Sequence, residues 1–501
     1  MKRQSGILMP VFSLYSEYGI GDFGKGAYGF VDFMKKAGQS VWQILPLVQT
    51  GYGNSPYSSV CSYSYNPYFI SPDILEEKGL VTEEEKEFCK YSDKYVDYGF
   101  LYSVRLPLLK KAYSRFDKTA ADFTAFKKRG EFYDYALYMS LKYASGQKHF
   151  YEWEDRYKYR DKDALGKFAD DYAEEIDFWQ FVQYEGQTEW RALKKYANEN
   201  GIEVFGDLPL YCALDSVDVW QNRSVFKMSD DFVPSVVSGV PPDFFSEKGQ
   251  LWGNPVYDYA AQQKDGFKWW TDRLERSLLD ADIIRIDHFR GLDRYYEIPA
   301  GSPDATCGKW ADVPSRELFD AIHKKVDKKR IVAEDLGIID DGVRELLAYT
   351  GYSGMKILSF AFNGEKDNLY LPEKLPENSV CYTGTHDNDT LKGYLAVCSE
   401  WDRNNFVTGV RNSVKETGIA VRPPETDDEL IDAVVELGMK SKSRLFIMPL
   451  QDILKSGSDM RINEPGTVKP QNWAVRFNKE DFSDGIAAKL LSLTEKYDRC
   501  K

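Results

Sequence analysis

ADIIRIDHF (281–289) combines a short, apolar, β-branched run with polar side chains at its end. Seven further runs share this build: GILMPVF (6–12), SVWQILPLV (40–48), IEVFGDLPL (202–210), RIVAEDLG (330–337), MKILSFAF (355–362), SVCYTGTHD (379–387) and SRLFIMPLQ (443–451). Stretches with helical periodicity, such as WRALKKYANENG and SRELFDAIHKKVDKK, lie between them. Strands that alternate with amphipathic helices indicate a parallel sheet, and eight of them predict an α/β fold that closes as a (β/α)8 TIM barrel.

Three gaps between the predicted strands are too long for simple loops. Residues 49–200 contain charged and aromatic helical sequence and predict a mainly helical subdomain on the C-terminal rim of the barrel. Residues 211–265 form a second, loop-rich insertion at the same rim, and residues 388–442 form a third, helical one. The last stretch, DGIAAKLLSLTEKY, reads as a closing helix, so we expect a single barrel over residues 1–501 without a separate C-terminal β-domain.

Charge and cysteine usage narrow the class of partner. The net charge of −14 argues against nucleic acid and against an anionic membrane, since both require a basic footprint. The chain has no apolar run long enough to span a bilayer, and its first residues read as a strand rather than a signal peptide. Seven scattered cysteines without a CxxC pair indicate reduced thiols and a cytoplasmic location.

Acidic residues stand at the ends of three predicted strands, where barrel enzymes carry their catalytic groups. The two-residue period of RIDHFRG places Arg285 and Asp287 on one side, and a neighbouring guanidinium keeps a carboxylate ionised. Glu334 ends the next strand, while His386 and Asp387 end the seventh. Singly, each acid could be a helix cap or a structural ion pair. Together they suit cleavage of a glycosidic bond, in which one carboxylate attacks and one carboxylic acid protonates the leaving oxygen.

Several longer motifs carry a resemblance to a known family. The motifs GDLPLY (206–211), RIDHFRG (285–291), AEDLG (333–337) and THDNDT (385–390) resemble the conserved regions of the α-amylase clan. A narrower set resembles the 4-α-glucanotransferases (amylomaltase or disproportionating enzyme) of glycoside hydrolase family 77: YGIGDFG (18–24), NSPYSS (54–59), NPY (66–68), GVPPDFFSEKGQLWGNPVYDY (239–259) and RINEPGTVKPQNW (461–473). These motifs cover nearly the whole chain.

The resemblance implies a role for each matching position. Asp287 would be the nucleophile, Glu334 the general acid/base, and Asp387 the group that binds hydroxyls of the distorted sugar. Six further residues would bind substrate or orient these three: Arg285, His386, Tyr57, Asp207, Trp252 and Asn463. Tyr57 and Trp252 could alternatively be ordinary packing residues, because large aromatic side chains are mostly buried.

The resemblance also implies the reaction. The enzyme would move a segment of an α-1,4-glucan (maltodextrin, amylose, or a glycogen or starch fragment) to the 4-hydroxyl of glucose or another glucan, through a covalent sugar–aspartate intermediate. The 211–265 region would then contribute active-site loops. No cofactor is expected, and the chain shows no concentrated cluster of oxygen ligands for calcium. Two alternatives stay open: an amylase-like retaining hydrolase, and a non-catalytic glucan-binding barrel, against which the intact set of three acids argues.

Overall fold

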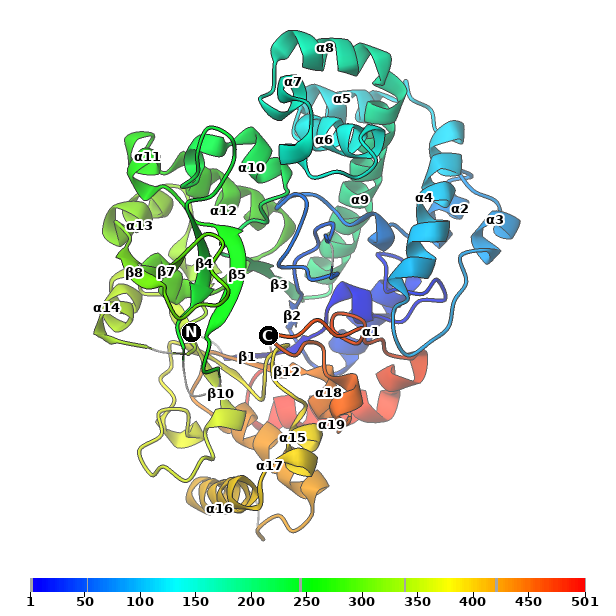
Figure 1. The fold of residues 1–501 in the computed structure, drawn as a ribbon. Helices are drawn as coiled ribbons and strands as arrows, with labels where there is room; N and C mark the ends of the chain where they lie inside the picture. Colours follow the sequence, from blue (N-terminus) through cyan, green and yellow to red (C-terminus); the bar gives the residue numbers. More distant parts are fainter. Residues whose placement is uncertain (1–2, 52, 243–245, 338, 420–421, 501) are drawn as a thin grey trace.

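The central feature of the computed structural model is a closed barrel of parallel strands (Figure 1). The structure describes residues 3–51, 53–242, 246–337, 339–419 and 422–500. The barrel strands are β1 (Gln4–Leu8), β2 (Val41–Gln43), β3 (Glu203–Leu208), β6 (Ile283–Ile286), β9 (Ile331–Ala333), β10 (Ser353–Ile357), β11 (Ser379–Tyr382) and β12 (Leu445–Pro449). β1 pairs with β12 along its whole length and thereby closes the barrel. Each strand overlaps one of the eight predicted runs, so the predicted (β/α)8 barrel is confirmed.

Amphipathic helices cover the outside of the barrel (Figure 1). They are α1 (Lys25–Lys36), α9 (Ala173–Glu199), α12 (Lys268–Asp280), α13 (Ser315–His323), α14 (Asp341–Thr350), α17 (Asp427–Lys440) and α19 (Asp484–Lys496). Helix α1 is an example of how these helices pack on the barrel. Its buried face includes Phe30, whose ring packs in a T-shaped arrangement with that of Trp42 in β2, with the ring centroids 5.3 Å apart. Burying such large rings is the main stabilising contribution of each helix.

The segment between β2 and β3 forms a helical layer above the barrel (Figure 1). Its helices are α2 (Pro72–Glu77), α3 (Glu83–Glu87), α4 (Tyr98–Arg115), α5 (Ala121–Arg129), α6 (Tyr133–Ala144), α7 (Asp155–Lys158) and α8 (Lys162–Asp171). Helix α9 serves two layers: Phe178 packs against Tyr113 of α4, while Trp190 packs against Trp42 of the barrel. The stretch 49–200 therefore contains a barrel helix in addition to the helices of the added layer.

A second, antiparallel sheet was not foreseen from the sequence. It contains β5 (Gln250–Pro255), β4 (Val236–Val240), β7 (Arg294–Pro299) and β8 (Lys309–Asp312), in that order. Its strands come from the connections that follow β3 and β6, so it stands at the C-terminal rim. Strands β5 and β8 are mostly exposed or half-buried and lack the continuous apolar run that marks the barrel strands. The same region, 211–265, also holds two short helices, α10 (Val217–Gln221) and α11 (Tyr259–Lys264).

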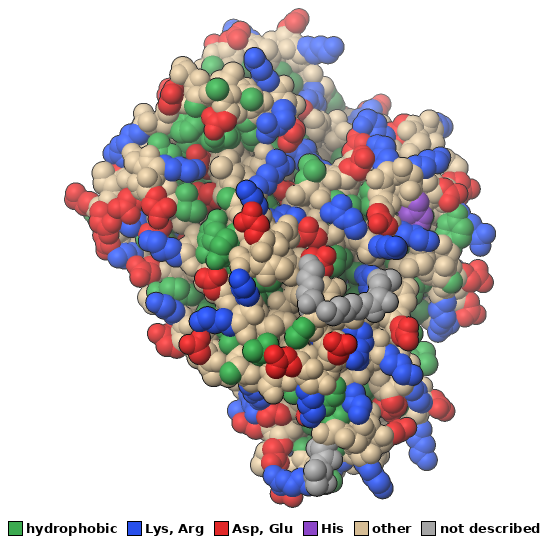
Figure 2. All heavy atoms as spheres, turned by 180° about the vertical axis from the view of Figure 1, so that it is seen from behind, with side chains coloured by type: hydrophobic (Ala, Val, Ile, Leu, Met, Phe, Trp, Pro, Cys, Tyr) green, Lys and Arg blue, Asp and Glu red, His purple; other side chains and the backbone are tan. Residues whose placement is uncertain are grey.

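The last part of the chain is helical. Helices α15 (Leu391–Val397) and α16 (Glu400–Thr417) precede α17, and α18 (Leu450–Ile453) and two 3-10 turns lie between β12 and α19. In the described part of the chain, no helix combines the length and the apolar character that crossing a bilayer requires. Figure 2 shows basic and acidic side chains interspersed over one face of the molecule, with no single-sign patch there.

Candidate active site

Arg285 joins two carboxylates at the C-terminal end of the barrel. Its Nη2 lies 2.7 Å from Oδ1 of Asp287, and its Nη1 lies 2.5 Å from Oδ2 of Asp207. The register of β3 and β6 explains the second pair, because it sets Asp207 directly opposite Arg285. Burial alone would lower the pKa of Arg285, but the two carboxylates outweigh it and hold the guanidinium charged. The predicted ion pair between Arg285 and Asp287 is therefore present.

Glu334 lies beside Asp287. Its amide donates to the carbonyl of Ile286 and its own carbonyl accepts from the amide of Phe289, so these bonds bracket Asp287. The carboxylate of Glu334 accepts from the amides of His288 at 2.6 Å and Leu336 at 3.0 Å. Burial raises the pKa of Glu334; Arg285 opposes this rise and the negative charge of Asp287 adds to it. The two neighbouring acids thus have opposite environments, one beside a cation and one desolvated.

His288 connects this pair to the antiparallel sheet. Its backbone adopts a left-handed conformation with φ of 48°, which is unfavourable for a residue with a side chain and is typical of functional sites. That conformation aims its amide at Glu334. Burial lowers the pKa of the imidazole to about 4, so the ring is neutral. The imidazole ring packs in a T-shaped arrangement with the ring of Trp252 in β5, and the two ring centroids are 4.8 Å apart.

Asp387 lies in the segment after β11, with both carboxylate oxygens engaged. Oδ1 accepts from Nδ2 of Asn463 at 2.6 Å, and Oδ2 lies 3.3 Å from Nε2 of His386. Burial would raise the pKa of Asp387, but the charge and hydrogen bond of His386 and the amide of Asn463 outweigh it and lower the pKa to about 2. Asp387 is therefore an oriented, ionised carboxylate.

Tyr57 contacts both parts of the site, the one that contains Asp207 and the one that contains His386 and Asp387. Its hydroxyl donates to Oδ2 of Asp207 at 2.6 Å, and its ring stacks on His386 with a centroid distance of 5.3 Å and an angle of 15°. Burial raises the pKa of Tyr57, so the hydroxyl keeps its proton and remains a donor. Among the sequence-predicted residues, Trp252 stands apart: within the part of the chain that the structure describes, it contacts this network through the ring of His288, and it is 38 % exposed.

Sequence reasoning missed two residues that fix the segment carrying Asp387. Arg461 donates from Nη2 to the carbonyl of Asp387 and from Nε to the carbonyl of Asn463, each at 2.7 Å. Asp452 accepts from the hydroxyl of Thr383 at 2.6 Å and from the amide of Leu391 at 2.8 Å, so one buried carboxylate holds both ends of the segment 383–391. Asp452 lies in α18, three residues after the end of β12, and its closeness to the end of the last barrel strand was the available signal.

Barrel enzymes carry their catalytic groups at the C-terminal end of the strands, and a pair of neighbouring carboxyl groups there suits an enzyme that acts on glycosidic bonds. Residues 9–481 match the model of glycoside hydrolase family 77, described as 4-α-glucanotransferase. A 4-α-glucanotransferase of Clostridium butyricum is 40% identical over 500 residues, which cover 98% of this chain and 100% of the relative. One from Thermus thermophilus is 39% identical over 509 residues, covering 100% and 99%.

The solved structures agree with this assignment. The amylomaltase from Streptococcus agalactiae in complex with acarbose matches with a TM-score of 0.94 at 34% identity, covering 100% of both chains. The amylomaltase from Corynebacterium glutamicum shares the fold, with a TM-score of 0.80 at 19% identity, covering 100% of this chain and 75% of that one. The chain belongs to the 4-α-glucanotransferase family, glycoside hydrolase family 77.

Proposed function

We propose that this 4-α-glucanotransferase works by a retaining double displacement in which Asp287 and Glu334 have complementary roles. The observation that carries the proposal is the contrast between the two acids. Asp287 lies 2.7 Å from a charged guanidinium, whereas burial raises the pKa of its neighbour Glu334. Two adjacent carboxyl groups, one paired with a cation and the other with a raised pKa, are suited to be a nucleophile and a general acid.

The first displacement forms a covalent intermediate. Asp287 attacks the anomeric carbon of the donor glucan while Glu334 gives its proton to the glycosidic oxygen, which leaves on the shortened chain. In the second displacement the 4-hydroxyl of an acceptor attacks the same carbon, its proton passes to Glu334, and the bond to Asp287 breaks. The enzyme returns to its starting protonation state and the α-configuration is kept.

The remaining residues orient the sugar and the two acids. We infer that Asp387 accepts hydrogen bonds from hydroxyls of the reacting sugar, with His386 beside it and Asn463 holding it in place. Arg285 positions Asp287 through their ion pair, and Asp207 holds the other end of the same guanidinium. Tyr57 and the half-exposed Trp252 supply aromatic faces for sugar rings.

Substrates and location are part of the proposal. Donors and acceptors are α-1,4-glucans and glucose; the net charge of −14 disfavours nucleic acid and anionic membranes. We infer a single catalytic unit over residues 1–501, with rim segments in 49–200 and 211–265 shaping the acceptor groove and excluding water. A cytoplasmic location is supported by the seven scattered cysteines, which form no CxxC pair. The proposed chemistry needs no cofactor.

Incubation with maltotriose tests transfer against hydrolysis. A transferase yields free glucose together with a ladder of longer maltodextrins, because a glucan end accepts the transferred segment. Shorter products alone would identify the amylase-like hydrolase instead. No turnover of any maltodextrin would identify the non-catalytic barrel.

A further inference from the structure

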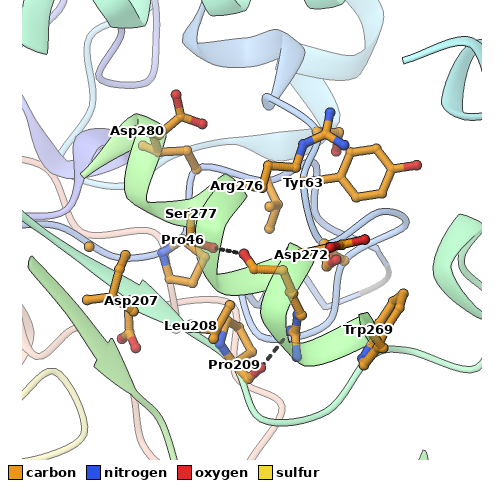
Figure 3. Close-up of a pocket in the computed structure, with 18 of the residues that line it drawn as sticks. Pro46, Tyr63, Asp207, Leu208, Pro209, Trp269, Asp272, Arg276, Ser277 and Asp280 are labelled. Atoms are coloured by element: carbon orange, nitrogen blue, oxygen red, sulfur yellow. Dashed lines mark hydrogen bonds between the residues drawn. The ribbon is translucent and has the colours of Figure 1, made fainter. Parts of the chain in front are cut away.

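A cavity of about 380 Å³ lies outside the group formed by Asp287, Glu334 and Asp387, none of which lines it. It is bordered by α12, by residues 44–48 after β2, and by residues 206–209 at the end of β3 (Figure 3). Of the active-site residues, only Asp207 lines it, and Figure 3 shows the carboxylate of Asp207 pointing away from Arg276. The volume falls in the range of small-molecule sites, which begins at about 300 Å³.

Helix α12 presents an unusual polar face to this cavity. Its apolar stripe, Trp270, Leu274 and Leu278, is buried. A second stripe at helical spacing lines the cavity: Trp269, Asp272, Arg273, Arg276, Ser277 and Asp280. A polar helix face ordinarily looks into bulk solvent. Here residues of the added helical layer, among them Glu131 and Asp134, stand over it, and the space between them has both polar and apolar walls.

The lining combines aromatic and charged groups. Figure 3 shows Tyr63 and Trp269 on the same side of α12. The guanidinium of Arg276 lies 3.9 Å from the ring centroid of Tyr63 and donates to the carbonyl of Glu131 at 3.3 Å. Asp272 and Asp280 stand one turn before and one turn after Arg276 on the same face. The rim is open to solvent, because the side chain of Asp272 is 46 % exposed.

The chemistry of the lining selects a class of ligand. Carboxylates outnumber Lys and Arg in it, which disfavours phosphates and other anions. Among the described residues, no group of three or more His, Cys, Asp or Glu side chains is arranged to hold a metal ion. Planar carboxylate and guanidinium groups bind pairs of neighbouring hydroxyls through two parallel hydrogen bonds, and aromatic faces cover the apolar face of a sugar ring. A neutral carbohydrate satisfies all these features.

We propose that this cavity is a second, non-catalytic carbohydrate site that takes one or two sugar units, such as glucose or the free end of a glucan. It shares a wall with the active site, since Arg273 donates to the carbonyls of Pro209 and Leu210 just after Asp207. The site extends the proposed function without depending on the role of Asp287.

Glucose alone tests the proposal, because it contains no glycosidic bond and is not turned over. The full chain is labelled with 5-fluorotryptophan, and the resonances of Trp269 and Trp252 are assigned with Trp269→Phe and Trp252→Phe. Trp269 reports on the cavity and Trp252 on the active site. During a glucose titration followed by ¹⁹F NMR, we expect both resonances to shift, with different apparent Kd values.

Two variants make the experiment specific. Ser277→Phe fills the cavity and should weaken the Trp269 response by at least about tenfold while leaving that of Trp252 unchanged. Its matched control is Leu279→Phe, on the same helix at a side chain that is 58 % exposed and outside the cavity lining; it should keep both responses. Asp272→Ala, at the solvent-facing rim, should weaken the Trp269 response without risk to the core.

Three outcomes would overturn the second site: a Trp269 resonance that stays fixed while Trp252 saturates, an unchanged response in both Ser277→Phe and Asp272→Ala, or a response of Trp269 to inorganic phosphate but not to glucose. A fixed Trp252 resonance beside a moving Trp269 would instead count against the proposed active site alone.

Discussion

The side-chain amide of Asn463 donates to Oδ1 of Asp387 at 2.6 Å, although the two residues are 76 positions apart in the chain. The backbone amide of Asn463 also donates to the carbonyl of His386 at 3.1 Å. Because His386 holds the second oxygen, the orientation of Asp387 is set before any sugar arrives. A preoriented carboxylate stabilises developing positive charge more effectively than one that must reorganise.

Replacing Asn463 tests this relationship. Asn463→Ala should lower kcat/KM by about 10²-fold, the usual cost of removing one preorganised donor. Asn463→Asp should be worse as pH rises, because two facing carboxylates cannot both ionise at this distance. Rates measured across pH separate the two variants. Asn478→Asp, at an exposed position that caps a 3-10 turn, is the control and should behave as the unaltered chain.

Asp287→Asn should reduce transfer from maltotriose on the order of 10⁴-fold, because it removes the nucleophile while keeping the shape of the side chain. A fluorinated maltosyl donor that forms the intermediate faster than it is released should label the unaltered chain, and peptide mass spectrometry should place the label on Asp287. The control is the same substitution at an exposed position: Asp341→Asn, at a side chain that is 92 % exposed, should keep the activity of the unaltered chain. Near-normal transfer by Asp287→Asn, or a label on another residue, excludes the assignment.

Glu334→Gln should abolish transfer from maltotriose but spare the first step with a maltosyl fluoride, whose leaving group needs no proton. In the unaltered chain the raised pKa of Glu334 keeps the acid protonated at neutral pH, so transfer should decline as pH rises through that pKa. A Glu334→Gln chain that turns over both donors equally poorly would indicate a structural role instead.

The same pKa predicts a trend in stability. Since the folded chain binds this proton more tightly than the unfolded chain, whose pKa is near 4.5, stability falls as pH rises from about 4.5 through the raised folded value. Glutamine removes this titration. The Tm of Glu334→Gln, measured by thermal unfolding, should therefore rise relative to that of the unaltered chain between about pH 5 and about pH 9. A constant difference would mean that the pKa of Glu334 is ordinary.

Asp452→Asn should destabilise the chain by about 1–3 kcal/mol, because the amide group can accept from only one of its two donors and leaves the other unpaired. It should also lower kcat more than it changes KM for short donors, since it disturbs Asp387 rather than the binding loops. Urea unfolding and steady-state rates measure the two effects. Thr383→Ala removes only one donor and should lie between the variant and the unaltered chain; full activity in Asp452→Asn would contradict the positioning role.

The sequence predicted the barrel well because each barrel strand is a nearly continuous apolar run, which only a strand buried on both faces requires. It also placed Asp287 and Glu334 directly after barrel strands, whereas Asp387 lies five residues beyond the end of β11 rather than at a strand end. The antiparallel sheet escaped because β5 and β8 are largely exposed and carry no such run. Contacts such as Tyr57 with Asp207 depend on how distant segments meet, and no local pattern encodes that. The left-handed turn at His288 was not predicted either, because histidine is enriched in that conformation but adopts it in only a small share of cases.

The two hydrogen bonds of Asp452 fasten both ends of the segment 383–391 to a single point inside the protein. Ordering such a stretch costs conformational entropy, roughly 1–2 kcal/mol for each residue fixed. In this chain the segment is ordered once, when the chain folds, and not again each time a glucan binds. In the proposed mechanism, the segment that binds the reacting sugar is therefore already rigid, and the affinity of the sugar is not diminished by ordering a loop at every turnover.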